Sequence, residues 1–151
     1  MDCNAAGAVT REREIRGPEG VLVLPVPPSA NRYWRTTVAT TRLGKGYVKT
    51  YVTREADEYR EGVRARALVA GFRPLEGDVA VTIRWYRKAK RGDLDNRVKV
   101  TLDALQGAAY HTDAQVAELH VVRFEESLNP RLEVEVVPVQ AVLARIGGDA
   151  P

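Results

Sequence analysis

The strongest constraint on the fold is a change of hydrophobic period between residues 53 and 86. Over residues 53–71 apolar side chains recur at steps of three and four residues, which predicts an amphipathic helix. These side chains are Ala56, Tyr59, Val63, Ala67 and Ala70. Thr53 suits the N-cap of this helix and Gly71 its C-cap. Residues 78–86 then alternate apolar and polar side chains, as a half-buried strand does, so the chain must pack a helix on a sheet.

The segments around this unit predict another strand and another helix. Residues 21–26, "VLVLPV", predict a short strand that Pro25 places at a sheet edge or ends. Residues 29–52 show little helical pattern and predict a flexible loop or hairpin rich in positive charge. A second helix is expected to begin near Asn96. It would face the core with Val98, Leu102 and Leu105.

Residues 115–124 and 131–139 alternate like a pair of strands, and their linker "EESLNP" suits a hairpin connection. The resulting order is strand, loop, helix, strand, helix, strand, strand. This order predicts a small single α/β (α+β) domain over residues 20–139, with two main helices packed on a mixed β-sheet. Residues 1–19 and 140–151 are expected to be tails, the first of them flexible.

The cysteine content and the distribution of charge indicate the cellular compartment and the kind of partner. The only cysteine, Cys3, excludes an intrachain disulfide and favours a reducing compartment. Because no apolar run is long enough to cross a membrane, we expect a cytoplasmic protein without a membrane partner. The net charge is only +3, but the bases cluster in two segments, which indicates a nucleic-acid partner. The first segment holds Arg32, Arg35, Arg42, Lys45 and Lys49, and the second holds Arg84, Arg87, Lys88, Lys90, Arg91, Arg97 and Lys99.

The stretch "RGDLDNRVKV" places Asp93 and Asp95 two residues apart inside the second basic segment. On extended backbone their carboxylates would point to the same side and repel each other unless a cation lay between them. Carboxylate oxygens suit Mg²⁺ or Mn²⁺. A metal that activates water, beside bases that attract phosphate, is what phosphodiester hydrolysis needs. The pattern therefore favours a metal-dependent nuclease site.

Structural interpretations compete with this one. Asp95 or Asn96 could simply cap the second helix. A calcium loop is rejected, because Val98 stands where its glycine would be and no glutamate closes the loop.

Two further residues could join the site. Asp113, in "YHTDAQV", follows the second helix, although spacing alone does not bring it near Asp93. Lys99 lies one helical turn beyond Asn96, on the side that would face the acidic pair. It could equally be a solvated lysine or a partner of Asp103 at i+4.

Three stretches together resemble the RusA family of Holliday junction resolvases, which phages and prophages often carry. They are "LPVPPSANRYWR", "RGDLDNRVKVTLDALQGAAYHTDAQV" and the closing strand pair, over roughly residues 20–138. The motifs occur in the family's order and spacing, which is more specific than any one of them. The resemblance implies a homodimeric, Mg²⁺-dependent endonuclease, with Mn²⁺ as the alternative ion. Such an enzyme resolves four-way DNA junctions by paired nicks in recombination and repair.

The resemblance also implies roles for individual residues. Asp93, Asp95 and Asp113 would bind the metal, and Lys99 would be the essential basic residue that stabilises negative charge or orients the attacking water. Many members carry two consecutive aspartates before "xQV"; Thr112 replaces the first here, so Asp113 is the expected ligand. Together with the basic segments, the resemblance predicts a DNA-binding set. It comprises Asn31, Arg32, Arg35, Arg87, Lys88, Lys90, Arg91 and Asn96.

Two other functions remain open beside the resolvase. The first is a nuclease with a broader choice of branched DNA, cutting forks or flaps as well. Sequence does not separate it from a resolvase, because junction selectivity depends on dimer shape and loop conformation. The second is a catalytically idle DNA-binding protein. The intact set of Asp93, Asp95, Asp113 and Lys99 argues against it.

Overall fold

The computed structural model describes residues 20–90 and 92–147. In chain order its elements are β1 (Leu22–Leu24), α2 (Ala30–Tyr33), β2 (Trp34–Thr40), β3 (Gly46–Val52), α3 (Arg54–Val69), β4 (Val79–Arg87), α4 (Leu94–Leu105), the 3-10 turn η2 (Asp113–Gln115), β5 (Val116–Glu125), β6 (Arg131–Pro138) and α5 (Val139–Ile146). The predicted N-terminal tail, residues 1–19, lies outside the described residues.

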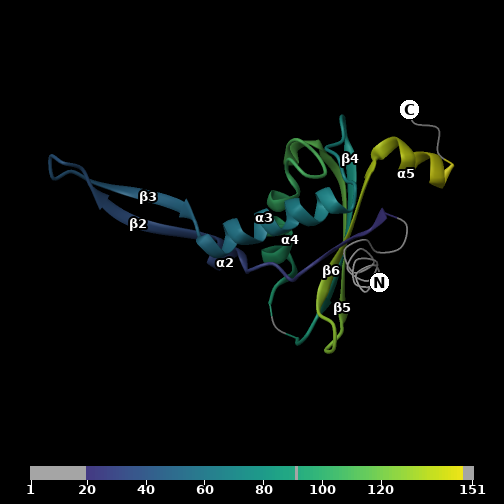
Figure 1. Cartoon of the computed structure of the whole chain (residues 1–151), viewed down its shortest axis with the longest axis horizontal. Coiled ribbons are helices and arrows are strands. Elements are labelled where there is room, and N and C mark those ends of the chain that lie inside the picture. Colours follow the sequence, from purple (N-terminus) through teal and green to yellow (C-terminus); the bar gives the residue numbers. More distant parts are fainter. Residues whose placement is uncertain (1–19, 91, 148–151) are drawn as a thin grey trace, which may run out of the picture.

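The main sheet has four strands in the order β1-β6-β4-β5. β4 pairs in parallel with β5 and antiparallel with β6, and β6 pairs antiparallel with β1. α3 and α4 lie on the same side of this sheet (Figure 1), and the side chains between the two layers form the core. This arrangement confirms the predicted mixed sheet with two main helices packed on it.

The pairing predicted for the last two strands is wrong, because β4 lies between β5 and β6 and bonds to both. β4 is buried along most of its length, with Val81, Ile83 and Trp85 in the core, so it takes the centre of the sheet. The linker passes the end of β4, where the Glu126 amide donates to the Arg87 carbonyl at 2.8 Å. Alternation shows which face of a strand is buried but not which strand is its neighbour.

α3 follows its predicted bounds closely. The Thr53 hydroxyl accepts a hydrogen bond from the Ala56 amide at 3.4 Å. At the other end Ala70 is the C-cap, and Gly71 follows it at φ +79°. The residues that α3 buries are Ala56, Tyr59, Val63 and Ala67, all of them predicted. α4 begins at Leu94, two residues before the predicted start.

α5 was not predicted, and it covers residues assigned above to the C-terminal tail. It lies on the opposite side of the sheet from α3 and α4 (Figure 1), where Arg145 reaches Glu135 of β6 at 3.6 Å. Within the described ranges, no helix combines the length and the apolar character needed to span a membrane.

β2 and β3 form an antiparallel hairpin that projects from the sheet and helices (Figure 1), which is one of the two alternatives predicted for residues 29–52. Thr53 anchors its base: the Thr53 amide donates to the Tyr33 carbonyl at 2.9 Å, and its hydroxyl donates to the Arg32 carbonyl at 2.7 Å. Tyr33 is buried in the core immediately before β2 begins. The hairpin is therefore a two-stranded arm fixed at its base.

Candidate active site

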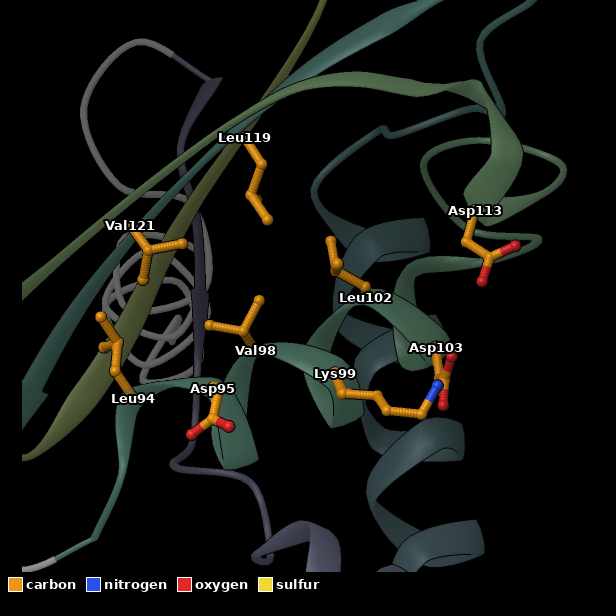
Figure 2. Close-up of a pocket in the computed structure, with 9 residues that line it drawn as sticks. All are labelled: Leu94, Asp95, Val98, Lys99, Leu102, Asp103, Asp113, Leu119 and Val121. Atoms are coloured by element: carbon orange, nitrogen blue, oxygen red, sulfur yellow. The ribbon is translucent and has the colours of Figure 1, made fainter.

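A pocket with a volume of about 560 Å³ lies between α4 and β5 (Figure 2). Its charged lining residues are Asp95, Lys99 and Asp103 from α4 and Asp113 from η2. Its apolar lining residues are Leu94, Val98, Leu102, Leu119 and Val121. Elements that are consecutive in the chain thus bring carboxylates and an ammonium group to the same cavity.

Helix geometry explains the α4 side of the pocket. Asp95, Lys99 and Asp103 follow one another at intervals of four residues and so lie on one face of the helix. Figure 2 shows the Lys99 side chain extending toward Asp103. Val98 and Leu102, which were predicted to face the core, pack against it and also form the apolar wall of the pocket. The sequence suggests Asp103 only as a partner of Lys99, although the repeated four-residue interval is enough to place it at the site.

Asp113 is held at the pocket by η2, and Gln115 fixes this turn in place. The Gln115 side-chain oxygen accepts hydrogen bonds from the amides of the two residues before Asp113, at 2.8 and 3.0 Å. Its side-chain nitrogen donates to the carbonyls of Leu75 and Gly77, both at 2.8 Å. Gln115 therefore ties the turn to the segment that precedes β4. The alternation of residues 115–124 predicts Gln115 as part of the following strand and gives no sign of this role.

The buried phenol of Tyr110 connects the end of α4 with η2. Its hydroxyl donates to the Leu102 carbonyl at 2.8 Å. Burial raises the pKa of this phenol, and the negative charges of Asp113 and Asp103 raise it further. Figure 2 shows Asp103 and Asp113 at the same end of the pocket.

Asp93 occupies the N-cap of α4, is exposed, and makes no capping hydrogen bond through its side chain. Gly92 precedes it at φ +91°, a backbone angle that glycine adopts without strain. Asp95 is helical, so the expectation that both carboxylates project from extended backbone is wrong. The alternative in which Asp95 or Asn96 caps the helix is also wrong, because both residues lie inside α4.

The predicted metal ligands do not form a ready cluster. Among residues 20–90 and 92–147, no three histidine, cysteine, aspartate or glutamate side chains lie close enough to hold a metal ion. Asp95 and Asp113 share the pocket, whereas Asp93 is not among its lining residues. The donor chemistry does fit a hard divalent cation, because each candidate ligand is an exposed carboxylate. The ligand set therefore stays a prediction.

The predicted DNA-binding residues between β4 and α4 differ in their surroundings. Lys88 and Lys90 are exposed just before α4 begins. The assignment of Arg87 to the DNA-binding set is corrected, because its side chain is only 8% exposed and pairs with Glu125 at 3.2 Å. The parallel register of β4 and β5 sets these two residues opposite each other. Arg91 lies outside the described residues.

The remaining predicted DNA-binding residues lie on three elements. Asn31 and Arg32 are exposed on α2, Arg35 is exposed on β2, and Asn96 is half-buried on α4. These residues lie on the arm, on the short helix α2 that precedes it, and on α4, the helix that carries the pocket.

Arg97, which the sequence shows only as one of the clustered basic residues, joins α4 to the segment before α2. Its guanidinium donates to the Pro27 carbonyl and so ties α4 to the segment before α2. Arg97 and Arg32 also line a second pocket of about 410 Å³, together with Glu55. Burial lowers the pKa of Arg97, and the positive charge of Arg32 lowers it further. The negative charge of Glu55, which lines the same pocket, raises the pKa of Arg97 and so offsets part of the effect of Arg32.

Comparison with known proteins gives a consistent result. The family model described as Endodeoxyribonuclease RusA matches residues 25–137. A crossover junction endodeoxyribonuclease RusA from Escherichia coli (strain K12) is 34% identical over 119 residues, which cover 76% of this chain and 91% of that protein. Its namesake from Enterobacteria phage 82 is 33% identical over 119 residues, with the same shares covered. The one from Enterobacteria phage HK97 is 30% identical over 129 residues, covering 80% of this chain and 96% of its own.

Proposed function

The chain belongs to the RusA family of endodeoxyribonucleases, and from this premise we propose that it resolves four-way DNA junctions. The observation that carries the proposal is the pocket that Asp95, Lys99 and Asp113 share. The exposed Lys88 and Lys90 come just before α4, the helix that carries Asp95 and Lys99. Metal-dependent cleavage of a phosphodiester needs carboxylates that can hold the metal and a positively charged side chain in one place, next to a surface that attracts phosphate. The proposed place of action is the cytoplasm, in keeping with a DNA substrate.

Asp93, Asp95 and Asp113 are the residues that would hold Mg²⁺, or Mn²⁺ in its place. Such an ion, when bound, lowers the pKa of the attacking water and offsets negative charge on the phosphate. Asp95 and Asp113 line one pocket. Asp93 lies two residues from Asp95, and no capping hydrogen bond holds its carboxylate away from the pocket.

Lys99 is the residue that would act on the scissile phosphate directly. Negative charge grows on the phosphate oxygens as water attacks phosphorus, and a fixed ammonium group beside them stabilises that charge. Asp103, toward which the Lys99 side chain extends, would keep the ammonium group directed along the pocket. Exposed bases outside the pocket, Lys88 and Lys90 among them, would hold the DNA backbone without taking part in the reaction.

Resolution needs two opposed nicks, so two copies acting as a symmetric dimer fit the reaction. Strand β5 supports a contact between copies, because it is an edge strand with large apolar side chains exposed on the face turned away from the pocket. These side chains are Val122 and Phe124. We expect sedimentation to show a dimer at concentrations where the protein cuts DNA. A protein that cuts junctions while wholly monomeric would contradict this part of the proposal.

A cleavage assay tests the function. A labelled four-way junction is incubated with the protein beside duplex, fork, flap and single-stranded DNA, each with Mg²⁺ and with excess EDTA. We expect paired, symmetric nicks in the junction only when the metal is present. Undiminished cleavage in EDTA would remove the metal assignment. Equal cleavage of forks or flaps would replace the resolvase with a broader branched-DNA nuclease, and tight junction binding without cleavage would identify an idle DNA-binding protein.

A further inference from the structure

The β2–β3 arm has two chemically different faces. Residues paired across an antiparallel ribbon point to the same side, and side chains alternate along each strand. One face therefore carries only uncharged residues, namely Trp34, Thr36, Val38, Thr40, Gly46, Val48, Thr50 and Val52. The other face, here called the basic–aromatic face, carries Arg35, Thr37, Ala39, Tyr47, Lys49 and Tyr51. The Thr36 and Thr50 hydroxyls lie 3.3 Å apart on the uncharged face, as this register requires.

The basic–aromatic face is open to solvent and free of negative charge. Tyr47 is 48% exposed and Tyr51 is 42% exposed, and Arg35 and Lys49 are exposed as well. Residues 30–54 contain no aspartate or glutamate. On this surface aromatic rings alternate with positively charged side chains. Such a surface suits a nucleic acid, because the positive charges bind its phosphates and the rings stack on its flat nucleobases.

Other occupants fit this face less well. In a symmetric contact between two copies, two identical faces that carry only positive charge would meet, which is unfavourable. The domain itself does not cover the face, since the arm projects away from the sheet and helices (Figure 1). A lone two-stranded ribbon is only marginally stable in water, so a bound partner would also stabilise the arm.

We propose that the basic–aromatic face lies on the DNA at the branch point, where Tyr47 and Tyr51 stack on exposed bases and Arg35 and Lys49 bind phosphates. This inference rests on the proposed function and extends it to the feature of the DNA that the arm recognises. The two tyrosines lie four residues apart on β3, about 13 Å, with Lys49 between them. Seven residues per strand give the arm a length of about 23 Å, so it adds contacts beyond those of the pocket.

Fluorescence of 2-aminopurine tests the inference without relying on cleavage. The probe is placed at the branch point of one junction and inside an arm of a second junction, and the protein is added in EDTA. The double variant Tyr47→Thr/Tyr51→Thr removes both rings and keeps residues that favour strands. Its matched control is Val38→Thr/Val48→Thr, a cross-strand pair on the uncharged face. Tyr47→Phe/Tyr51→Phe keeps the rings and should behave like the parent protein.

With the parent protein we expect a signal change at the branch-point probe and little change at the arm probe. The double threonine variant should lose that change, and its preference for junction over duplex should fall by roughly tenfold or more. The control and phenylalanine variants should keep both. Parental signal and preference in the double threonine variant, shown to be folded by circular dichroism, would overturn the inference. So would an equal response from both probes, which would indicate binding to duplex arms.

The failure of this inference is distinguishable from failure of the proposed function. If the parent protein cuts junctions and the double threonine variant binds them as the parent does, only the role of the arm is wrong. If the parent protein neither prefers nor cuts junctions, the proposed function is wrong, and the inference falls with it.

Discussion

Asp95, Lys99 and Asp103 present an acid, a base and an acid on successive turns of α4. This part of the site follows from the sequence, because the interval of four residues fixes a common helix face. The burial and pairing of Arg87 do not follow from the sequence. Its partner Glu125 is 38 residues away and reaches it only through the parallel pairing of β4 with β5. Residue-level prediction therefore succeeds within one helix and fails where the exposure and the partner of a side chain depend on the pairing of distant strands.

Asp93→Asn tests the metal assignment. Removal of a ligand charge should lower cleavage by orders of magnitude. Junction affinity measured without metal should hold or increase, because an acid that repels phosphate has gone. Single-turnover cleavage in Mg²⁺ and affinity in EDTA are measured on the same folded sample, with Asp78→Asn as the control on exposed surface. Near-normal cleavage would remove Asp93 from the metal ligands and leave it only its position at the N-cap of α4, which asparagine fills equally well.

Lys99→Ala tests the assignment of the base. Cleavage should be abolished, whereas junction affinity should fall only slightly, as for one phosphate contact among many. Lys90→Ala is the matched comparison: it should weaken binding by a similar amount and leave single-turnover cleavage at saturating protein close to normal. Equal loss of cleavage in both variants would mean that Lys99 contributes binding alone.

Gln115→Leu tests how Asp113 is positioned. The substitution removes four hydrogen bonds and leaves backbone groups at the turn without partners, so unfolding should become easier by about 1–3 kcal/mol. Cleavage by the folded variant should fall as well, with DNA affinity in EDTA kept. The control Gln140→Leu, at an exposed position of α5, should change stability by no more than about 0.5 kcal/mol. Parental cleavage by folded Gln115→Leu would show that the turn holds Asp113 without this side chain.

At the scale of elements, the predictable segments are those whose caps and periodicity agree. α3 has both, and its buried residues Ala56, Tyr59, Val63 and Ala67 were predicted individually. α5 has no capping hydrogen bond at its start and packs by contacts with β4 and β6, which its own eight residues do not reveal. The order of strands was beyond prediction for the same reason, because it depends on which strand buries most surface in the assembled domain.

Thr53→Ala tests a residue that stabilises both the start of α3 and the base of the β2–β3 arm. The Thr53 hydroxyl caps α3 and also donates to the Arg32 carbonyl at the base of the arm. Its loss should destabilise the domain by about 1–2 kcal/mol in urea unfolding. Hydrogen exchange of the β2 and β3 amides should also become faster. Thr53→Ser keeps the hydroxyl and should retain most of the stability, and equal losses in both variants would assign the effect to the methyl group instead.

At the scale of the whole molecule, the exposed basic residues proposed to bind DNA lie in two regions, and the contact between α2 and α4 joins these regions. One is the loop with Lys88 and Lys90, and the other is the arm with Arg35 and Lys49. The layered architecture and the charged segments were both predicted, but their spatial relation depends on how α2 and α4 meet. Arg97 helps to set that relation through its bond to Pro27.

Junction binding is therefore expected to depend steeply on salt. Each phosphate that a base neutralises releases a counterion, so affinity in EDTA should fall linearly on a logarithmic salt scale. Combined removal of Arg35 and Lys49 should lower the slope by about 2, one for each contact. Affinity that stays constant from low to physiological salt would contradict an electrostatic interface.

The order of strands in the sheet also determines how much of the chain must be made before the sheet can form. β1 pairs only with β6, more than a hundred residues later in the chain, and β4 needs β6 on one side and β5 on the other. Pairings between such distant segments form late, after the local helices. Leu119 and Val121 of β5 line the pocket, so the pocket is complete only once β5 lies beside β4. We therefore expect a chain that ends before β6 to leave β4 without one of its two neighbours and to be inactive as a nuclease.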